Sequence, residues 1–124
     1  MTAPKSILII SRDKALRNTR TFILERAGYH VSSACTDDEA VRFVEASNAY
    51  SLVLLCHSVP EKSRLFLVDI LKELQPSLPI LMLYNSYDPT EAKVDGILHS
   101  LDSPTALLNM IGFFTQEVRL AEAS

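Results

Sequence analysis

Short apolar runs alternate with longer segments of helical periodicity along this chain, and no other feature constrains the fold as strongly. Residues 7–10, 52–56 and 80–83 are apolar runs bounded by polar or turn-forming residues. The segments between such runs place apolar residues three and four positions apart, as amphipathic helices do. Repeated strand–helix units of this kind predict an α/β fold in which helices cover both faces of a parallel sheet.

Five strand–helix units fit the chain. The expected strands cover residues 6–11, 29–34, 50–56, 78–84 and 96–99. The expected helices cover residues 14–27, a segment capped by Thr36 that runs to about residue 47, residues 63–75, a short segment after Asp88, and a last segment from Ser103 that includes Val118. The predicted apolar stripe of the first helix is Leu16, Phe22, Ile23 and Ala27, and that of the third is Leu65, Val68, Ile70, Leu71 and Leu74.

Composition narrows the class of protein. A chain of 124 residues that is 48% apolar predicts one compact domain over residues 1–124. The 12 basic and 15 acidic residues are scattered, so no basic surface for nucleic acid is expected. The apolar runs are too short to cross a membrane, and two cysteines predict free thiols in a reducing compartment. We therefore expect a soluble, cytoplasmic protein that binds neither nucleic acid nor membrane.

Several motifs follow one another in a recognisable order and spacing. They are residues 6–10 before a polar turn, residues 25–29 around a glycine, residues 52–55 with Pro60 beyond them, residues 78–83, and residues 95–98 with Pro104 after them. Together they resemble the receiver domain of response regulators, the CheY-like fold, over residues 6–118. The resemblance implies a doubly wound five-stranded parallel sheet of order 2-1-3-4-5 and a role in two-component signalling.

The residues that would carry the chemistry of this family have all changed. Active receivers place two acids after the first strand, an aspartate after the third, a Thr or Ser after the fourth and a lysine after the fifth. In this chain those places fall on Ser11 and Arg12, on Cys56, on Tyr84 and on Ser100. The resemblance therefore implies a degenerate receiver that has lost its phosphoacceptor.

These substitutions disfavour a magnesium site, because Mg²⁺ prefers carboxylate and other oxygen ligands. A guanidinium at Arg12 repels a cation, and a thiol at Cys56 is too soft a ligand for magnesium. Asp13 is the nearby carboxylate, and its place at a helix start predicts an N-cap. We expect no metal, no cofactor, no phosphorylation of Cys56 and no enzymatic activity.

A small-molecule or thiol-redox sensor is the alternative of a different class. Its pocket at the carboxyl ends of the strands would use Arg12, Cys56, Tyr84 and His99. Redox sensing would require a low thiol pKa, for which a neighbouring Arg12 would be the physical basis. Arg12 at a helix start could also hold an anion, although the glycines of phosphate-binding loops are missing.

A candidate interface lies on the last strand and the last helix. Ile97 occupies the position of the aromatic switch residue of receivers, and Phe113 adjoins the core-facing Phe114. If Met110 and Phe113 are exposed, they form an apolar patch with Ile97; burial in the core is the other interpretation. The predicted function is phosphorylation-independent protein binding. The partner would be a histidine kinase, another regulator or a second copy, the last through helix four, strand five and helix five.

Overall fold

A five-stranded parallel sheet of order β2-β1-β3-β4-β5 forms the centre of the molecule in the computed structural model, which describes residues 5–84, 94–99 and 103–115. The strands are β1 (Ser6–Ile10), β2 (His30–Ala34), β3 (Tyr50–Leu55), β4 (Ile80–Tyr84) and β5 (Gly96–His99). The described helices are α1 (Lys14–Arg26), α2 (Asp37–Ala46), α3 (Glu61–Leu74) and α4 (Pro104–Thr115). This confirms the predicted fold class and strand order.

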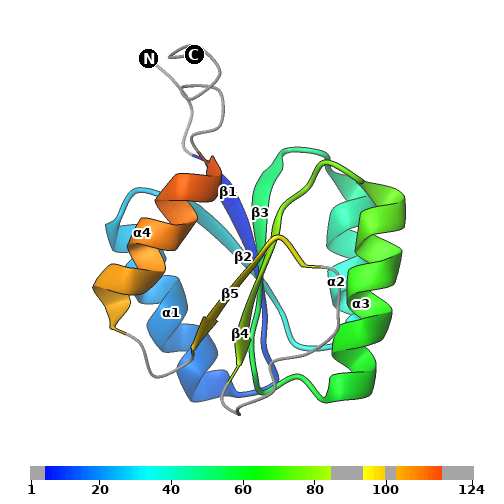
Figure 1. Ribbon diagram of the computed structural model, residues 1–124, viewed down its shortest axis with the longest axis horizontal. Coiled ribbons are helices and arrows are strands. Elements are labelled where there is room, and N and C mark those ends of the chain that lie inside the picture. The colour runs from blue at the N-terminus through cyan, green and yellow to red at the C-terminus, as the bar shows by residue number, and fades with distance from the viewer. Residues whose placement is uncertain (1–4, 85–93, 100–102, 116–124) are drawn as a thin grey trace.

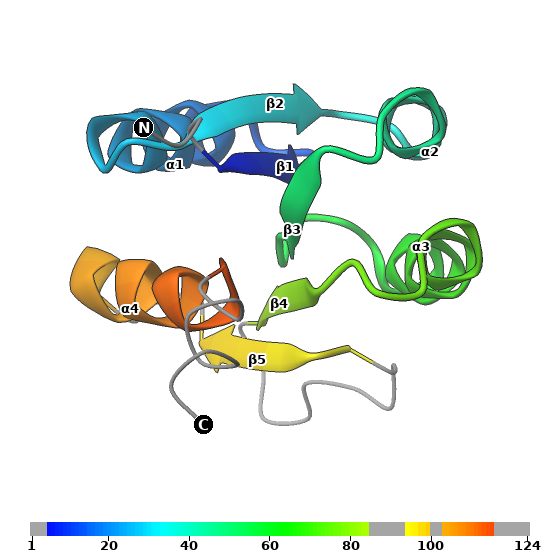
Figure 2. The same ribbon diagram turned by 90° about the horizontal axis from the view of Figure 1, so that it is seen from above.

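The helices form a layer on each face of the sheet. Helices α1 and α4 cover one face, and α2 and α3 cover the other (Figures 1 and 2). The sheet is buried on both sides because its central strands are almost continuously apolar. Ile7 and Ile9 pack toward the α1/α4 layer, whereas Leu8 and Ile10 pack toward the α2/α3 layer. The Cys56 side chain belongs to the α1/α4 side of the core.

Local capping signals place the starts of α1 and α2 as the sequence predicts, whereas α3 begins at Glu61, two residues before the predicted start. Asp13 caps α1 by accepting a hydrogen bond of 3.0 Å from the Leu16 amide. Thr36 and Glu39 form the predicted capping box of α2. Gly28 has a positive φ of 99° just after α1, a conformation that glycine adopts without strain. These contacts fix where α1 and α2 begin, and therefore which residues follow β1 and β2.

Two of the predicted helix stripes are partly wrong. In α1, Phe22 is 61% exposed, and the buried residues are Arg20 and Leu24. In α3, Leu65 and Leu74 are exposed, and Leu67 joins Val68 and Leu71 in the core. The stripes were predicted from hydrophobicity alone, whereas burial depends on which side of each helix packs against the sheet.

Some predicted features fall on residues that are not described. The short helix after Asp88 and the continuation of the last helix to Val118 both lie outside the described ranges.

Asp95, just before β5, accepts hydrogen bonds from the Ile80 amide at 2.7 Å and from Lys72 at 2.6 Å. Within the described residues, no helix is both long and apolar enough to cross a membrane.

Candidate functional site

The carboxyl edge of the sheet brings two of the predicted site residues together. Ser11 follows β1 and Cys56 follows β3, and both are fully buried. The Cys56 amide donates a hydrogen bond of 2.9 Å to the Ile10 carbonyl, and the Ser11 amide donates one of 3.0 Å to Ala34. Adjacent parallel strands thus place Ser11 and Cys56 side by side, as the resemblance implies for an acid and a phosphoacceptor. Ser100 lies outside the described residues.

Ser58, in the turn after β3, satisfies the polar groups at the start of α1. Its hydroxyl lies 3.0 Å from the Ser11 hydroxyl and accepts hydrogen bonds from the amides of Arg12 at 2.9 Å and Asp13 at 3.3 Å. These amides would otherwise be available to an anion. Sequence reasoning gave the Ser58 hydroxyl no role, because a serine in a turn carries no motif signal.

The Arg12 side chain is held by three groups on neighbouring segments. Its guanidinium forms a salt bridge of 2.6 Å with Asp37 at the start of α2 and donates to the Ser63 hydroxyl at 3.3 Å. It also donates to the Cys35 carbonyl. We refer to Arg12, Asp37, Ser63 and the Cys35 carbonyl as the Arg12 network. Because the charge of Arg12 is paired there, this arginine is poorly placed to hold the anion suggested by its sequence position.

The donors at this edge do not fit a magnesium ion. The Asp13 carboxylate is used as the cap of α1, and the Asp37 carboxylate is paired with Arg12. The remaining described side-chain groups are the Ser11 and Ser58 hydroxyls and the Cys56 thiol, which are poor substitutes for the carboxylates that Mg²⁺ prefers. In the part of the chain that the structure describes, no three His, Cys, Asp or Glu residues are grouped to hold a metal ion.

Burial sets the chemistry of the Cys56 thiol. It raises the pKa of Cys56 from 9.0 to about 11, and the nearby Arg20 guanidinium and Ser11 hydroxyl only partly oppose this rise. The redox hypothesis required a low thiol pKa, and that prediction is wrong. Removing the thiol from water raises its pKa by more than the neighbouring charge lowers it. The neighbouring cation is also not the one expected, since it comes from α1 and not from Arg12.

Burial also disfavours the charged form of the neighbouring His57, which lowers its pKa, and the charge of Arg20 adds to this effect. The His57 Nδ1 atom is buried and has no hydrogen-bond partner among the described residues. A neutral imidazole is favoured by both effects. With its thiol protonated and this imidazole uncharged, the Cys56–His57 pair lacks the ion-pair character of an activated cysteine.

Arg20 is the functional candidate that sequence reasoning missed. It is only 8% exposed, and its Nη1 atom has no hydrogen-bond partner in the described part of the chain. It lies four residues after Leu16 and three before Ile23, on the face of α1 that packs inward. A charged residue between two apolar ones at helical spacing was the available signal. The predicted stripe passed over Arg20 because charged side chains are rarely buried.

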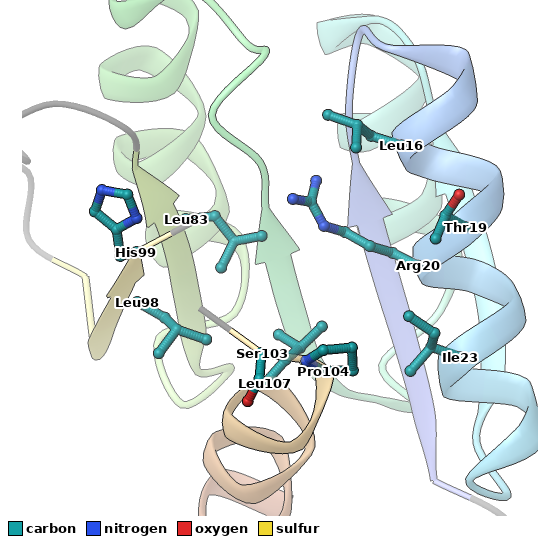
Figure 3. Close-up of a pocket in the computed structure, with 10 residues that line it drawn as sticks. All are labelled: Leu16, Thr19, Arg20, Ile23, Leu83, Leu98, His99, Ser103, Pro104 and Leu107. Carbon is teal, nitrogen blue, oxygen red and sulfur yellow. The ribbon is translucent and has the colours of Figure 1, made fainter. Parts of the chain in front are cut away.

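A pocket of about 150 Å³ opens in front of Arg20. Its walls come from α1, from the ends of β4 and β5, and from the first turns of α4 (Figure 3). The Arg20 guanidinium points from α1 across this space toward Leu83 and the strand ends. His99 lies at the rim, and its ring packs edge-on against Tyr84 with the ring centres 5.1 Å apart. Two predicted site residues, Tyr84 and His99, therefore meet beside this pocket.

The predicted interface residues lie on β5 and α4. Phe113 is 59% exposed, Ile97 is also exposed, and Met110 is partly buried. Phe113 packs edge-on against Phe114 with ring centres 5.3 Å apart. Of the two interpretations left open by the sequence, the structure thus favours exposure for Phe113. Ile97 pairs with Met82, which belongs to the α2/α3 side of the core, so Ile97 faces away from α4 at the edge of the sheet. We refer to Met110 and Phe113 on α4, together with Ile97 on the edge strand β5, as the β5–α4 patch.

Comparisons with known proteins agree with this geometry at the level of the fold. No protein-family model matches the chain, and no curated protein matches it. Among solved structures, a CheY-like response regulator receiver domain protein from Methanospirillum hungatei JF-1 is 27% identical, with a TM-score of 0.82 over 92% of this chain and 95% of that one. A response regulator receiver domain protein from Clostridium thermocellum is 19% identical, with a TM-score of 0.85 over 94% and 98%.

The similarity extends to a domain of a larger protein. The N-terminal domain of a response regulator/sensory box/GGDEF 3-domain protein from Carboxydothermus hydrogenoformans is 23% identical, with a TM-score of 0.80 over 96% of this chain and 98% of that one. The fold and the layout of the strand ends thus define this chain as a protein with the CheY-like receiver fold, the fold used in two-component signalling.

Proposed function

We propose that this chain is a degenerate receiver that acts by protein–protein interaction and does not accept a phosphoryl group. The Arg12 network is the observation that carries the proposal. At a place where the resemblance implies an acid, a guanidinium is paired with Asp37 at 2.6 Å. Phosphoryl transfer in this fold depends on a divalent cation held by oxygen ligands, and a fixed positive charge opposes its binding.

The chemistry of Cys56 supports the same conclusion. A thiolate, and not a thiol, is the nucleophilic form of cysteine. With a pKa raised to about 11 by burial, the Cys56 thiol is almost entirely protonated at neutral pH. It therefore replaces the acceptor aspartate with a group that is neither a good nucleophile nor a good metal ligand. Because the described residues of this edge offer no activated nucleophile, the proposed role is that of a binding protein and not of an enzyme.

The β5–α4 patch is the surface through which the protein would act. An exposed aromatic ring next to apolar side chains is typical of binding interfaces, where aromatic residues contribute much of the affinity. Phe113, at 59% exposure, is the central residue of this patch. The partner is a protein of a two-component or phosphorelay system: a histidine kinase, another regulator or a second copy of this chain.

The described environments of the two cysteines do not favour the thiol-redox alternative. Cys56 is fully buried, and the rise in its pKa makes the thiolate scarce. Cys35 is partly buried and free, and β1 lies between the strands that precede the two cysteines. A disulfide between them would have to span two strand spacings, about 10 Å, which exceeds the usual Cα separation of bridged cysteines.

Incubation with acetyl phosphate and Mg²⁺ tests the absence of phosphoryl transfer. We expect the intact mass of the protein to remain unchanged, because Cys56 replaces the acceptor carboxylate and the described carboxylates of the site, Asp13 and Asp37, are engaged elsewhere. A receiver with the full set of acidic residues, treated in parallel, is the positive control. A stoichiometric phosphoryl adduct on this chain would contradict the proposal.

Capture of partners from the native host tests the interface. Phe113→Ala should weaken capture of a specific partner about tenfold or more, as truncation of a central aromatic residue does. Phe66→Ala is the matched control, since Phe66 is 51% exposed but belongs to α3 on the opposite face of the sheet. Light scattering of both variants measures self-association directly. If both variants capture the same amount of partner and have the same molar mass in solution, the β5–α4 patch has no role in binding.

A further inference from the structure

The pocket between α1, the ends of β4 and β5, and the start of α4 combines one buried cation with apolar walls. Arg20 supplies the cation. The apolar walls are formed by Leu16, Ile23, Leu83, Leu98, Pro104 and Leu107. No carboxylate is among the described residues that line the pocket. Thr19, His99 and Ser103 complete the lining. Mainly apolar walls with a few polar or charged groups are typical of binding sites for small organic ligands.

Among the described residues, Arg20 lacks the charged or carbonyl partners that a structural arginine normally has. A buried guanidinium is costly unless it is paired, and structural arginines in protein interiors normally have carboxylate or carbonyl partners. Arg12, on the other side of the sheet edge, has three such partners in the Arg12 network. Arg20 has no carboxylate partner among the described residues, and its Nη1 atom has no hydrogen bond there. It interacts with the thiol of Cys56, which is uncharged.

The surroundings of the pocket favour a negative charge opposite Arg20. Helix α4 begins at Pro104, and Ser103 caps it by accepting a hydrogen bond of 3.2 Å from the Ala106 amide. The positive end of the α4 dipole therefore adjoins the pocket. Figure 3 shows Ser103 and Pro104 at one end of the pocket and the Arg20 guanidinium directed into it from α1. Both contributions attract an anion toward the Arg20 guanidinium, whose buried Nη1 atom has no hydrogen-bond partner among the described residues.

Size and lining identify the class of anion. A pocket of about 150 Å³ matches the volume of an apolar cavity that holds one benzene molecule. A single guanidinium suits the single charge of a carboxylate, whereas a phosphate dianion would need further donors to replace its lost hydration. We propose that this pocket binds a small aromatic monocarboxylate, with the carboxylate on Arg20 and the ring against Leu83, Leu98 and Leu107. This proposal is independent of the proposed function, because it concerns a separate surface and a direct binding measurement.

Titration of the protein with benzoate, followed by amide NMR shifts and calorimetry, tests the proposal. We expect saturable binding with shifts centred on Leu16, Ile23, Leu98 and Leu107. Arg20→Met, which keeps the length of the side chain but not its charge, should weaken binding about tenfold or more, since a hydrogen bond to a charged group contributes at least that factor. Arg20→Lys keeps the charge without the planar donor pair and should give an intermediate affinity.

The controls separate a specific carboxylate site from nonspecific binding. Benzamide has the same shape without the charge and should bind about tenfold more weakly than benzoate. Arg26→Met removes a positive charge from an exposed position of α1 and should leave the benzoate affinity unchanged. Cooperative urea unfolding verifies that each variant is folded. Absence of benzoate binding, equal affinity in Arg20→Met, or stronger binding of inorganic phosphate would each overturn the proposal.

Discussion

At the scale of single residues, two arginines of this protein have opposite environments. Arg12 is partly exposed and paired, whereas Arg20 is buried and lacks a carboxylate partner among the described residues. Sequence position made Arg12 a candidate anion-binding residue, because it follows β1 at the start of a helix. The structure instead pairs Arg12 with Asp37 on α2 and leaves Arg20 facing a pocket. Pairing depends on residues distant in sequence, which a single motif does not reveal.

The burial of Arg20 should reduce the stability of the free protein. Arg20→Leu removes a buried charge and keeps an apolar side chain in the core, so we expect the free energy of unfolding to rise by about 1–3 kcal/mol. Urea denaturation measures this change. Arg26→Leu, at an exposed site on the same helix, should change stability by less than about 0.5 kcal/mol. If Arg20→Leu instead destabilises the protein, the guanidinium has a structural role and not a binding role.

The Cys56 thiol should give stability a dependence on alkaline pH. Its pKa is 9.0 in its ordinary state and about 11 in the folded protein, so the unfolded chain loses its proton first as pH rises. The contribution of the neutral buried thiol is complete below pH 9 and is lost between about pH 9 and pH 11. A shift of about two units corresponds to about 3 kcal/mol.

Unfolding free energies of the native protein and of Cys56→Ala, measured from pH 7 to pH 11, isolate this contribution. Lysine and tyrosine titrations affect both proteins alike, so the difference between the two curves reports on the thiol. We expect that difference to shrink as pH rises above 9. A constant difference across the whole range would mean that Cys56 ionises as readily in the folded state as in the unfolded chain.

At the scale of elements, contact between β5 and α4 depends on a glycine. A Cβ atom added at Gly96 would lie 2.7 Å from the ring of Phe114 and 3.2 Å from Leu81. Phe114 must therefore move, which loosens the packing of α4 against β5. We expect Gly96→Ala to lower the free energy of unfolding by about 1–3 kcal/mol. In the Phe114→Leu background, Gly96→Ala should lower the free energy of unfolding by less than it does in the native protein.

Chemical denaturation of the four proteins forms a double-mutant cycle that tests this steric account. Additive effects of the two substitutions would contradict it, because the predicted clash disappears once the ring is removed. The same cycle bears on function. Helix α4 carries Phe113 of the β5–α4 patch and also lines the Arg20 pocket, so a displaced α4 should alter both surfaces.

Sequence reasoning was most successful for whole elements and least successful for the orientation of helices. The strand runs, the Asp13 cap and the Thr36–Glu39 capping box are local signals, and the structure confirms them. The inward faces of α1 and α3 depend on how each helix lies on the sheet, so Phe22 and Leu65 were wrongly placed in the core. Arg20 was missed for the same reason: a charged side chain is expected in water, and only the packing of α1 on the sheet buries it.

At the scale of the whole molecule, the sheet edge joins residues from distant parts of the chain. Ser11 and Arg12 follow β1, and Cys56 follows β3, so a ligand bound by all three positions would be bound only in the folded state. Binding of such a ligand stabilises the protein in proportion to the logarithm of its concentration. We therefore expect the unfolding midpoint of this chain to be unchanged by about 10 mM Mg²⁺ beyond the effect of ionic strength.

Placing acidic residues at these positions should make the free energy of unfolding depend on Mg²⁺. In the triple variant Ser11→Asp, Arg12→Asp and Cys56→Asp, three like charges meet at the edge of the sheet, so the metal-free protein should be less stable than the parent. Mg²⁺ relieves that repulsion, and at about 10 to 100 times its dissociation constant it should add about 1–3 kcal/mol of stability. NaCl at matched ionic strength is the control, because screening alone should recover much less. Equal Mg²⁺ stabilisation of the parent chain would mean that its sheet edge still binds the metal, and the proposal of a degenerate receiver would then fail.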